Sequence, residues 1–310
     1  MSQEIAPITS DVTTSTGDEP DDTLVPEGAA SYPYIHLAQR VMAGAGQEIP
    51  IPSGMTRIFA AMCIPNEHGQ SMGGHTEQVR KLSTGLAEGL NRCSPALAVP
   101  DDVMRILKVC TTLHDIGKTG PAPDINSEPE QFIFYYNLNF PAGEARSAML
   151  VDDLDKAVMS GKLLPYTRDY MISTLIKAGY DPYKMTRRDL YTTHLGFTDD
   201  IAGHFGFSRD IRGGSAMHHS KKGLTTNGYK TRDFLHISRV TEPADEAGGM
   251  SREGNDNSRL GIRETAQAIF IPFESISDRA VSQAYCATLS AAFAHDIFQN
   301  ILKENRRPEF

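Results

Sequence analysis

Apolar residues recur at every third or fourth position over most of the chain from about residue 34 onwards. This spacing places them on one face of a helix and is typical of amphipathic helices packed in a core. The clearest runs are Val79, Leu82, Leu86 and Leu90, followed by Val103, Ile106, Leu107, Cys110 and Leu113. Strand signal is scant and confined to spots such as residues 268–273. The pattern therefore predicts an all-α fold.

The first 30 residues lack this periodicity. They are rich in Ser, Thr, Asp, Glu and Pro and poor in large apolar groups. Such a segment cannot bury enough surface to offset the entropy that it loses on ordering. We predict a disordered acidic tail over residues 1–30 and a single helical domain over residues 31–310.

The middle of the chain, about residues 121–183, is predicted to be a helical insertion. Helical patterns occupy residues 147–160 and 166–178. The aromatic run EQFIFYYNLNF at residues 130–140 fits either a strand or a buried helix segment. The insertion contains no cluster of candidate ligands. We expect it to form a wall of the substrate site or a surface between the subunits of a homo-oligomer.

Composition narrows the class of protein. The 310 residues are 40% hydrophobic and 22% charged, which is ordinary for a globular protein, and the formal net charge is -9. No overall basic field favours a nucleic acid polymer, so a phosphate-bearing ligand must be attracted by a local cluster of cations. No apolar run approaches the roughly 18 residues that span a bilayer, and the N-terminus lacks the features of a signal peptide. The four Cys form no CxxC pair, so we expect reduced thiols in a cytoplasmic protein.

The stretch TTLHDIGKTG at residues 111–120 places His114 beside Asp115 at the end of an apolar, helical run. An imidazole beside a carboxylate can hold two metal ions, because the His binds one ion while the Asp bridges to the second. Lys118, one turn further on, is placed to meet a phosphate as a point charge. The simpler alternative is that Lys118 is the partner that a buried Asp115 requires.

Other candidate ligands are scattered along the chain. His75 continues an apolar stripe at the head of a helix, His218 and His219 are adjacent, and Asp245 lies among small residues. Taken singly, each histidine is equally well explained as a hydrogen-bonded core residue or a residue facing solvent. Together with His194, however, every member of the set would need its own burial partner, and this favours a shared metal centre.

The order of these residues resembles that of the HD superfamily of metal-dependent phosphohydrolases. Within it, the closest resemblance is to the HD-GYP group, whose members hydrolyse cyclic dinucleotides such as cyclic di-GMP. The family's HDIGK element stands unaltered in this chain. The segments similar to the other elements are HTEQVRKLS at 75–83, MTRRDLYTTH at 185–194, the HH pair at 218–219, NGY at 227–229 and the AD dipeptide at 244–245.

Several positions depart from the HD-GYP pattern. Ser220 stands in place of the Glu of the HHE element, and Lys230 in place of the Pro of GYP. About fifty additional residues separate HDIGK from the MTRRD element. Some members carry a Glu that adds a third metal, and Ser71 stands at that place here, which implies two metals. These changes affect the identity of the substrate more than metal binding.

The resemblance implies a binuclear centre of two divalent ions, and mixed His and carboxylate ligands lead us to expect Fe or Mn. Asp115 would bridge the ions. The remaining ligands would be His75, His114 and Asp245 on one ion and His194, His218 and His219 on the other. A hydroxide held between the ions would attack phosphorus in line. Lys118 and Arg252 would neutralise developing charge, and Tyr229 would contact a phosphate or base.

We therefore predict a metal-dependent phosphoric ester hydrolase, namely a phosphodiesterase that cleaves a cyclic dinucleotide and binds neither nucleic acid polymers nor membranes. Three alternatives stay open: an HD phosphohydrolase acting on another nucleotide or phosphate ester, a catalytically silent cyclic-nucleotide receptor, and a di-iron oxygenase of the same superfamily. A helical scaffold with structural histidines is the simplest alternative. His204 is a rival for His194. A second His-Asp dipeptide, His295-Asp296, is expected on a packing helix that faces solvent or a partner subunit.

Overall fold

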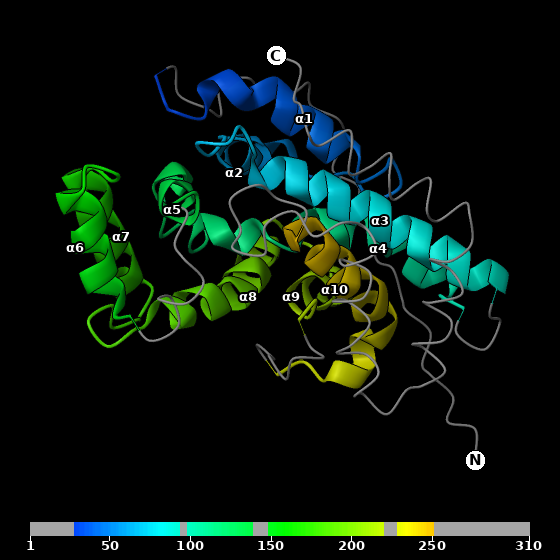
Figure 1. The fold of residues 1–310 in the computed structure, drawn as a ribbon. Coiled ribbons are helices and arrows are strands. Elements are labelled where there is room, and N and C mark those ends of the chain that lie inside the picture. The colour runs from blue at the N-terminus through cyan, green and yellow to red at the C-terminus, as the bar shows by residue number, and fades with distance from the viewer. Residues whose placement is uncertain (1–27, 94–97, 139–147, 220–227, 251–310) are drawn as a thin grey trace.

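The computed structural model describes residues 28–93, 98–138, 148–219 and 228–250 (Figure 1). These residues are helical, and among them the only extended pairing is an isolated antiparallel bridge between Met149 and Thr186. The predicted all-α fold is therefore confirmed. Most of the predicted tail, Arg252, the strand-like spot at 268–273 and His295-Asp296 lie outside the described residues.

Ten α-helices and several 3-10 turns follow one another along the described chain. The helices are α1 (Ile35–Ala43), α2 (Thr56–Met62), α3 (Met72–Cys93), α4 (Asp101–Leu113), α5 (Pro129–Tyr136), α6 (Leu150–Met159), α7 (Pro165–Lys177), α8 (Arg187–His204), α9 (Arg209–Ala216) and α10 (Leu235–Met250). The 3-10 turns are η2 (Tyr32–Tyr34), η3 (Ser53–Met55), η5 (Ile116–Thr119) and η7 (Thr231–Phe234). The helices predicted at 147–160 and 166–178 correspond to α6 and α7, and the aromatic run forms the helix α5 rather than a strand.

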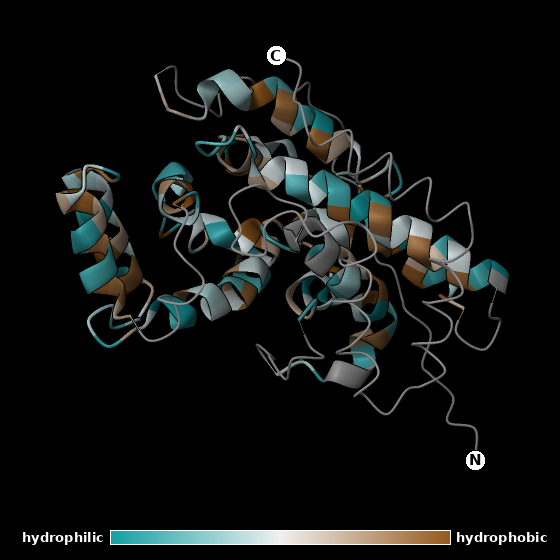
Figure 2. Cartoon of the chain, viewed as in Figure 1, coloured by the Kyte–Doolittle hydropathy of each residue, from teal (hydrophilic) through white to brown (hydrophobic). Residues whose placement is uncertain are grey.

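The helices surround one short turn, η5, which is separated from the end of α4 by His114 and Asp115. η5 contacts α2, α5 and α8, while α3 packs against α4 and α10, and α9 packs against α4 and α8. Figure 2 shows apolar and polar residues alternating along α1 and α3, as expected of helices with one buried face. The largest fully buried side chains include Phe59, Phe132, Tyr135 and Phe197. The core therefore lies around η5, and burial fixes the position of that turn.

Helix α8 begins at a well-defined residue. The Thr186 hydroxyl accepts a hydrogen bond from the Asp189 backbone N–H at 3.1 Å, and the Asp189 carboxylate accepts one from the Thr186 N–H at 2.8 Å. This capping box satisfies two donors that a helix start would otherwise leave without partners. At the start of α3, the Ser71 hydroxyl similarly accepts from the Gly74 N–H at 3.1 Å.

Helices α6 and α7 form a pair to one side of the other helices (Figure 1). The pair is joined to the start of α8 by two backbone hydrogen bonds, from Leu150 N to Met185 O and from Arg187 N to Ala148 O. A buried ion pair lies beside them, with the Arg187 Nε 2.5 Å from an Asp153 carboxylate oxygen. These contacts fix the first turns of α8. No described helix is both long and apolar enough to cross a membrane.

Candidate metal centre

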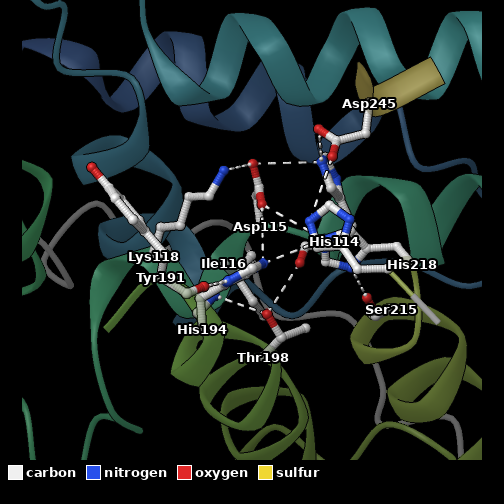
Figure 3. A network of polar contacts seen from close by, with 12 residues as sticks. His114, Asp115, Ile116, Lys118, Tyr191, His194, Thr198, Ser215, His218 and Asp245 are labelled. Atoms are coloured by element: carbon white, nitrogen blue, oxygen red, sulfur yellow. Dashed lines mark hydrogen bonds and ion pairs between the residues drawn. The ribbon is translucent and has the colours of Figure 1, made fainter. Parts of the chain in front are cut away.

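Five segments bring the predicted ligands together in the middle of the molecule. His75 lies in the first turn of α3, His194 lies within α8, and Asp245 lies on α10. His114 and Asp115 follow the end of α4, and His218 and His219 follow the end of α9. Figure 3 shows His114, Asp115, His194, His218 and Asp245 converging on one region. Their ligand atoms form two groups, each with all atoms within 4.8 Å of one another.

Gly117 explains how the HDIGK turn approaches α8 so closely. A Cβ atom at Gly117 would lie 1.9 Å from the His194 carbonyl oxygen and 2.6 Å from the Thr198 nitrogen. The Thr198 hydroxyl accepts from the Gly117 N–H and donates to the His114 carbonyl, both at 3.1 Å. Any larger residue would push the turn away from α8. The glycine therefore sets the distance between Asp115 and His194.

The first ligand group contains two histidines and two carboxylates. The Nε2 atom of His75 lies 2.7 Å from Asp245 Oδ1 and 3.7 Å from Asp115 Oδ2. The Nε2 atom of His114 lies 3.7 Å from the same Asp245 oxygen and 3.5 Å from the same Asp115 oxygen. Two ligands on one ion, each about 2.1 Å from it, are separated by about 3.0–4.2 Å. All but the hydrogen-bonded His75–Asp245 pair fall within this range, and that pair needs only a small shift.

The second ligand group contains three histidines. The Nε2 atoms of His194 and His218 are 3.3 Å apart, and the ring centroids of His218 and His219 are 4.1 Å apart. His194 and His218 are buried, whereas His219 is partly exposed. This group consists of imidazoles alone, so any negative charge on it must come from a neighbouring carboxylate.

Asp115 lies between the two groups and is fully buried. Its Oδ2 atom faces His75 and His114, as described above. Its Oδ1 atom faces the other group, 3.7 Å from His194 Nε2 and 3.9 Å from His218 Nε2. Asp245 also reaches both sides, because its Oδ2 atom lies 3.6 Å from His219 Nε2. Both carboxylates are thus placed between two sets of imidazoles.

The backbone fixes the tautomers of three histidines. The Nδ1 atoms of His114 and His218 each lie 2.7 Å from a carbonyl oxygen three residues earlier, those of Thr111 and Ser215. His194 makes the same contact with the carbonyl of Tyr191. A carbonyl only accepts, so each Nδ1 must donate, and in a neutral ring the Nε2 atom then presents a lone pair. All three lone pairs point to the centre, as metal-ligating histidines require.

Burial and neighbouring charges set the protonation of the two groups differently. Burial lowers the pKa of His194 to about 4, and burial with the nearby His219 holds the pKa of His218 well below its usual range. Burial also opposes the charged form of His114, but Asp115 and Asp245 beside it raise its pKa. His194 and His218 in the second group are therefore neutral at pH 7, whereas His114 in the first group is paired with two carboxylates.

The carboxylates themselves stay ionised. Burial disfavours the charged form of Asp115, but Lys118 and His114 hold its pKa well below the usual range. Burial acts in the same way on Asp245, and the neighbouring imidazoles of His114 and His75 hold its pKa well below the usual range. Anionic oxygen and neutral nitrogen are the ligand forms that a divalent metal ion requires.

Two buried polar atoms without hydrogen-bond partners test whether a metal ion fits the site. The Nε2 atom of His114 and the Oδ1 atom of Asp115 are buried without a hydrogen-bond partner. Buried polar atoms normally have partners, because desolvation without compensation is costly. Both atoms face the other candidate ligands, and both can donate an electron pair. The two buried clusters of His and Asp can therefore hold metal ions, as the sequence led us to expect.

The residues predicted to bind substrate have different surroundings. The Lys118 ammonium lies 2.5 Å from Asp115 Oδ2, and the side chain is 19% exposed. The Tyr229 hydroxyl donates to Asp199 Oδ1 at 2.6 Å, and its ring is buried against Phe234. Asp199 also accepts two hydrogen bonds from Arg212 at 2.9 Å. The predicted contact of Tyr229 with a substrate stays a prediction, and Arg252 lies outside the described residues.

The structure also places residues that the sequence did not single out. Thr198 links the HDIGK turn to α8, and the carbonyl of Tyr191 orients His194 (Figure 3). The sequence signal for the contact between His194 and Tyr191 was weak. A histidine in a helix can donate to the carbonyl three residues earlier, but only when its ring turns back along the helix. The rival His204 lies at the end of α8 in neither ligand group, and its ring is 3.8 Å from the exposed Asp124.

Comparison of the chain with protein-family models, with curated proteins and with solved structures gave no match in any of the three. The candidate metal centre is therefore supported by its own geometry.

Proposed function

We propose that this protein is a metal-dependent phosphohydrolase of the HD type. The observation that carries the proposal is the position of Asp115. One of its oxygens faces His75 and His114, and the other faces His194 and His218. A single buried carboxylate shared between two sets of imidazole ligands is the arrangement that a binuclear hydrolytic centre needs.

The chemistry follows from the ligand set. Two divalent ions bound to these residues would supply an activated water and a positive clamp for a phosphate oxygen. The imidazoles of His194 and His218 are oriented by backbone carbonyls, so they would hold their positions during a reaction. Lys118, at the edge of the centre, offers a positive charge to a phosphate group. With a net charge of -9, the chain depends on this local cluster to attract an anion.

The substrate that we propose is a cyclic dinucleotide, cleaved as a phosphodiester. This rests on the resemblance of the NGY and HH segments to the HD-GYP group. One observation favours a second candidate, an HD phosphohydrolase acting on another nucleotide or phosphate ester. The Tyr229 hydroxyl already donates to Asp199, and Lys230 follows it in place of Pro. A tyrosine held in this way has its hydroxyl committed to the protein.

Metal analysis combined with an activity screen tests the proposal. Wild type and Asp115→Ala would be purified with added Mn²⁺ or Fe²⁺ and their metal content measured by mass spectrometry. We expect about two ions per wild-type chain and strong loss in the variant. His204→Ala, which removes a histidine outside both groups, is the matched control and should keep the wild-type content.

The same preparations would be incubated with cyclic di-GMP, nucleoside triphosphates and phosphate monoesters. Hydrolysis of cyclic di-GMP by the wild type but not by Asp115→Ala supports the phosphodiesterase. Turnover restricted to other esters supports the second candidate. Full metal retention in Asp115→Ala overturns the site assignment. Tight binding of a cyclic nucleotide, without turnover in the presence of either metal, overturns the proposal that the protein is an enzyme.

A further inference from the structure

Lys118 has an asymmetric position in the candidate centre. Its ammonium lies 2.5 Å from Asp115 Oδ2. That same oxygen lies 3.5 Å from His114 Nε2 and 3.7 Å from His75 Nε2. The lysine thus contacts the carboxylate oxygen that belongs to the first ligand group, and Figure 3 shows its chain reaching across to that oxygen.

The other oxygen of Asp115 has no such neighbour. Oδ1 is buried without a hydrogen-bond partner and faces His194 and His218. The second ligand group therefore has an available carboxylate oxygen beside its imidazoles. In the first group, by contrast, the carboxylate oxygen is already paired with the Lys118 ammonium. A divalent ion arriving at the first group would meet that charge at short range, where repulsion between like charges is strong.

We propose that Lys118 is an internal counterion that competes with the metal ion of the first ligand group and leaves Asp115 when that ion binds. This rests on the binuclear centre of the proposed function. It predicts an order of loading: the group of His194, His218 and His219 takes an ion first, and the second ion must displace Lys118. The ammonium released in this way becomes available to a phosphate group.

The local structure permits this movement. Lys118 belongs to the 3-10 turn η5, three residues after Asp115, and its side chain is 19% exposed. A flexible four-carbon chain at the edge of the site can rotate its ammonium into solvent without moving the backbone. The turn itself is held by the close approach of Gly117 to α8. The lysine can therefore leave while Asp115 stays in place.

Titration of the metal-free protein with Mn²⁺ tests the competition. Calorimetry and the electron paramagnetic resonance of free Mn²⁺ would be used to measure two affinities in wild type, Lys118→Met and Lys118→Arg. A hydrogen bond between charged groups sets the scale, and its loss should tighten the weaker site of Lys118→Met by about ten- to hundredfold. The tighter site should change little. Lys118→Arg retains a cation and should stay close to the wild type.

A matched control is available in the exposed pair of Lys184 and Asp181. It has the same three-residue spacing at 2.7 Å, but Lys184 is 84% exposed. Lys184→Met should leave both Mn²⁺ affinities unchanged. Equal affinities in wild type and Lys118→Met, with two ions bound to each, overturn the competition while leaving the proposed function intact. Binding of no Mn²⁺ by the wild type overturns the proposed function itself.

A second measurement uses the wild type alone, so it does not depend on the folding of a variant. Lysines would be labelled with an amine-reactive reagent and located by mass spectrometry, with and without saturating Mn²⁺. We expect the labelling rate of Lys118 to rise at least severalfold on metal loading and that of Lys184 to stay constant. A rate for Lys118 that is unchanged or falls on loading overturns the release of the lysine.

Discussion

The Nε2 atoms of His194 and His218 face each other at 3.3 Å, although neither ring has a proton to place between them. Each ring donates its Nδ1–H to a backbone carbonyl, and burial keeps the pKa of both well below the usual range. Two lone pairs at this distance repel each other in the absence of a cation. The fold therefore maintains an arrangement that a bound metal ion would relieve.

Metal addition is expected to stabilise the protein strongly. At a free-ion concentration of 100 times Kd, binding to the native state adds about 2.7 kcal/mol to the free energy of unfolding. Because the entropy of unfolding grows with chain length, this raises the Tm of a 310-residue chain by about 4 °C. Differential scanning calorimetry of chelator-treated protein with and without Mn²⁺ or Fe²⁺ measures the shift.

Two histidine variants make that measurement specific. His218→Asn removes a ligand of the second group and should lose most of the metal-dependent rise in Tm. His36→Asn removes an exposed histidine on α1, whose ring contacts the Gln39 side chain at 3.3 Å, and should keep the full rise. An equal rise in both variants would mean that the ion binds elsewhere.

Gly117→Ala is expected to destabilise the protein and to weaken metal binding together. The new Cβ would overlap the His194 carbonyl and the Thr198 nitrogen, which are backbone atoms that cannot rotate away. Overpacking of this kind costs about 1–3 kcal/mol or more. Urea unfolding and Mn²⁺ titration would measure the two effects.

Gly85→Ala provides the comparison for that variant. Gly85 lies within α3, and a Cβ there would meet no atom within 4 Å. Alanine is favoured over glycine in a helix by up to about 1 kcal/mol, so this variant should be as stable as the wild type or more so. If Gly117→Ala matched Gly85→Ala in stability and in metal affinity, η5 could not approach α8 as closely as described.

The sequence predicted those features that leave a periodic or local signal. The helical class followed from apolar residues at three- and four-residue spacing, and the helices α6 and α7 were located in this way. The position of His114 and Asp115 at the end of α4 followed from the apolar run before them and the glycine after them. The proximity of His75 and Asp245, separated by 170 residues, came from the family resemblance and could not come from periodicity.

Other features depend on contacts that the sequence does not encode locally. The run that forms α5 is buried on several sides, and Phe132, Ile133 and Tyr135 are among its buried residues. It therefore shows no single apolar face. The pairing of the Tyr229 hydroxyl with Asp199 joins residues thirty positions apart. The direction of each Asp115 oxygen depends on how α4, α8 and α9 pack together, and no pattern in the sequence specifies it.

The buried ion pair of Arg187 and Asp153 should contribute strongly to stability. Both residues are 3% exposed, so removing one partner leaves a buried charge without compensation. Arg187→Met is expected to lower the free energy of unfolding by about 3–5 kcal/mol. Lys184→Met, which breaks an exposed pair that solvent screens, should leave it close to the wild-type value. Urea unfolding of both variants measures the difference, and similar values would contradict the role of burial.

The thiols of Cys63 and Cys110 are expected to resist alkylation in the folded protein. Burial raises the pKa of each to about 12, and the thiolate is the reactive form. Because the pKa in the unfolded chain is about 8.5, ionisation favours unfolding as the pH rises above that value. Peptide mapping after iodoacetamide treatment at pH 8 should find both residues unmodified until urea is added. Rapid labelling of the native protein would contradict their burial.

Asp245→Asn is expected to weaken the binding of both metal ions rather than of one. Asp245 Oδ1 lies 2.7 Å from His75 Nε2, whereas Oδ2 lies 3.6 Å from His219 Nε2, so the carboxylate reaches both ligand groups. An amide keeps the shape but removes the charge that a divalent ion requires. His75→Asn, by comparison, removes a ligand of the first group alone. Metal analysis and Mn²⁺ titration should therefore show about one tightly bound ion in His75→Asn. In Asp245→Asn, they should show a lower affinity for both ions. One ion held in Asp245→Asn as tightly as in the wild type would restrict Asp245 to the first group.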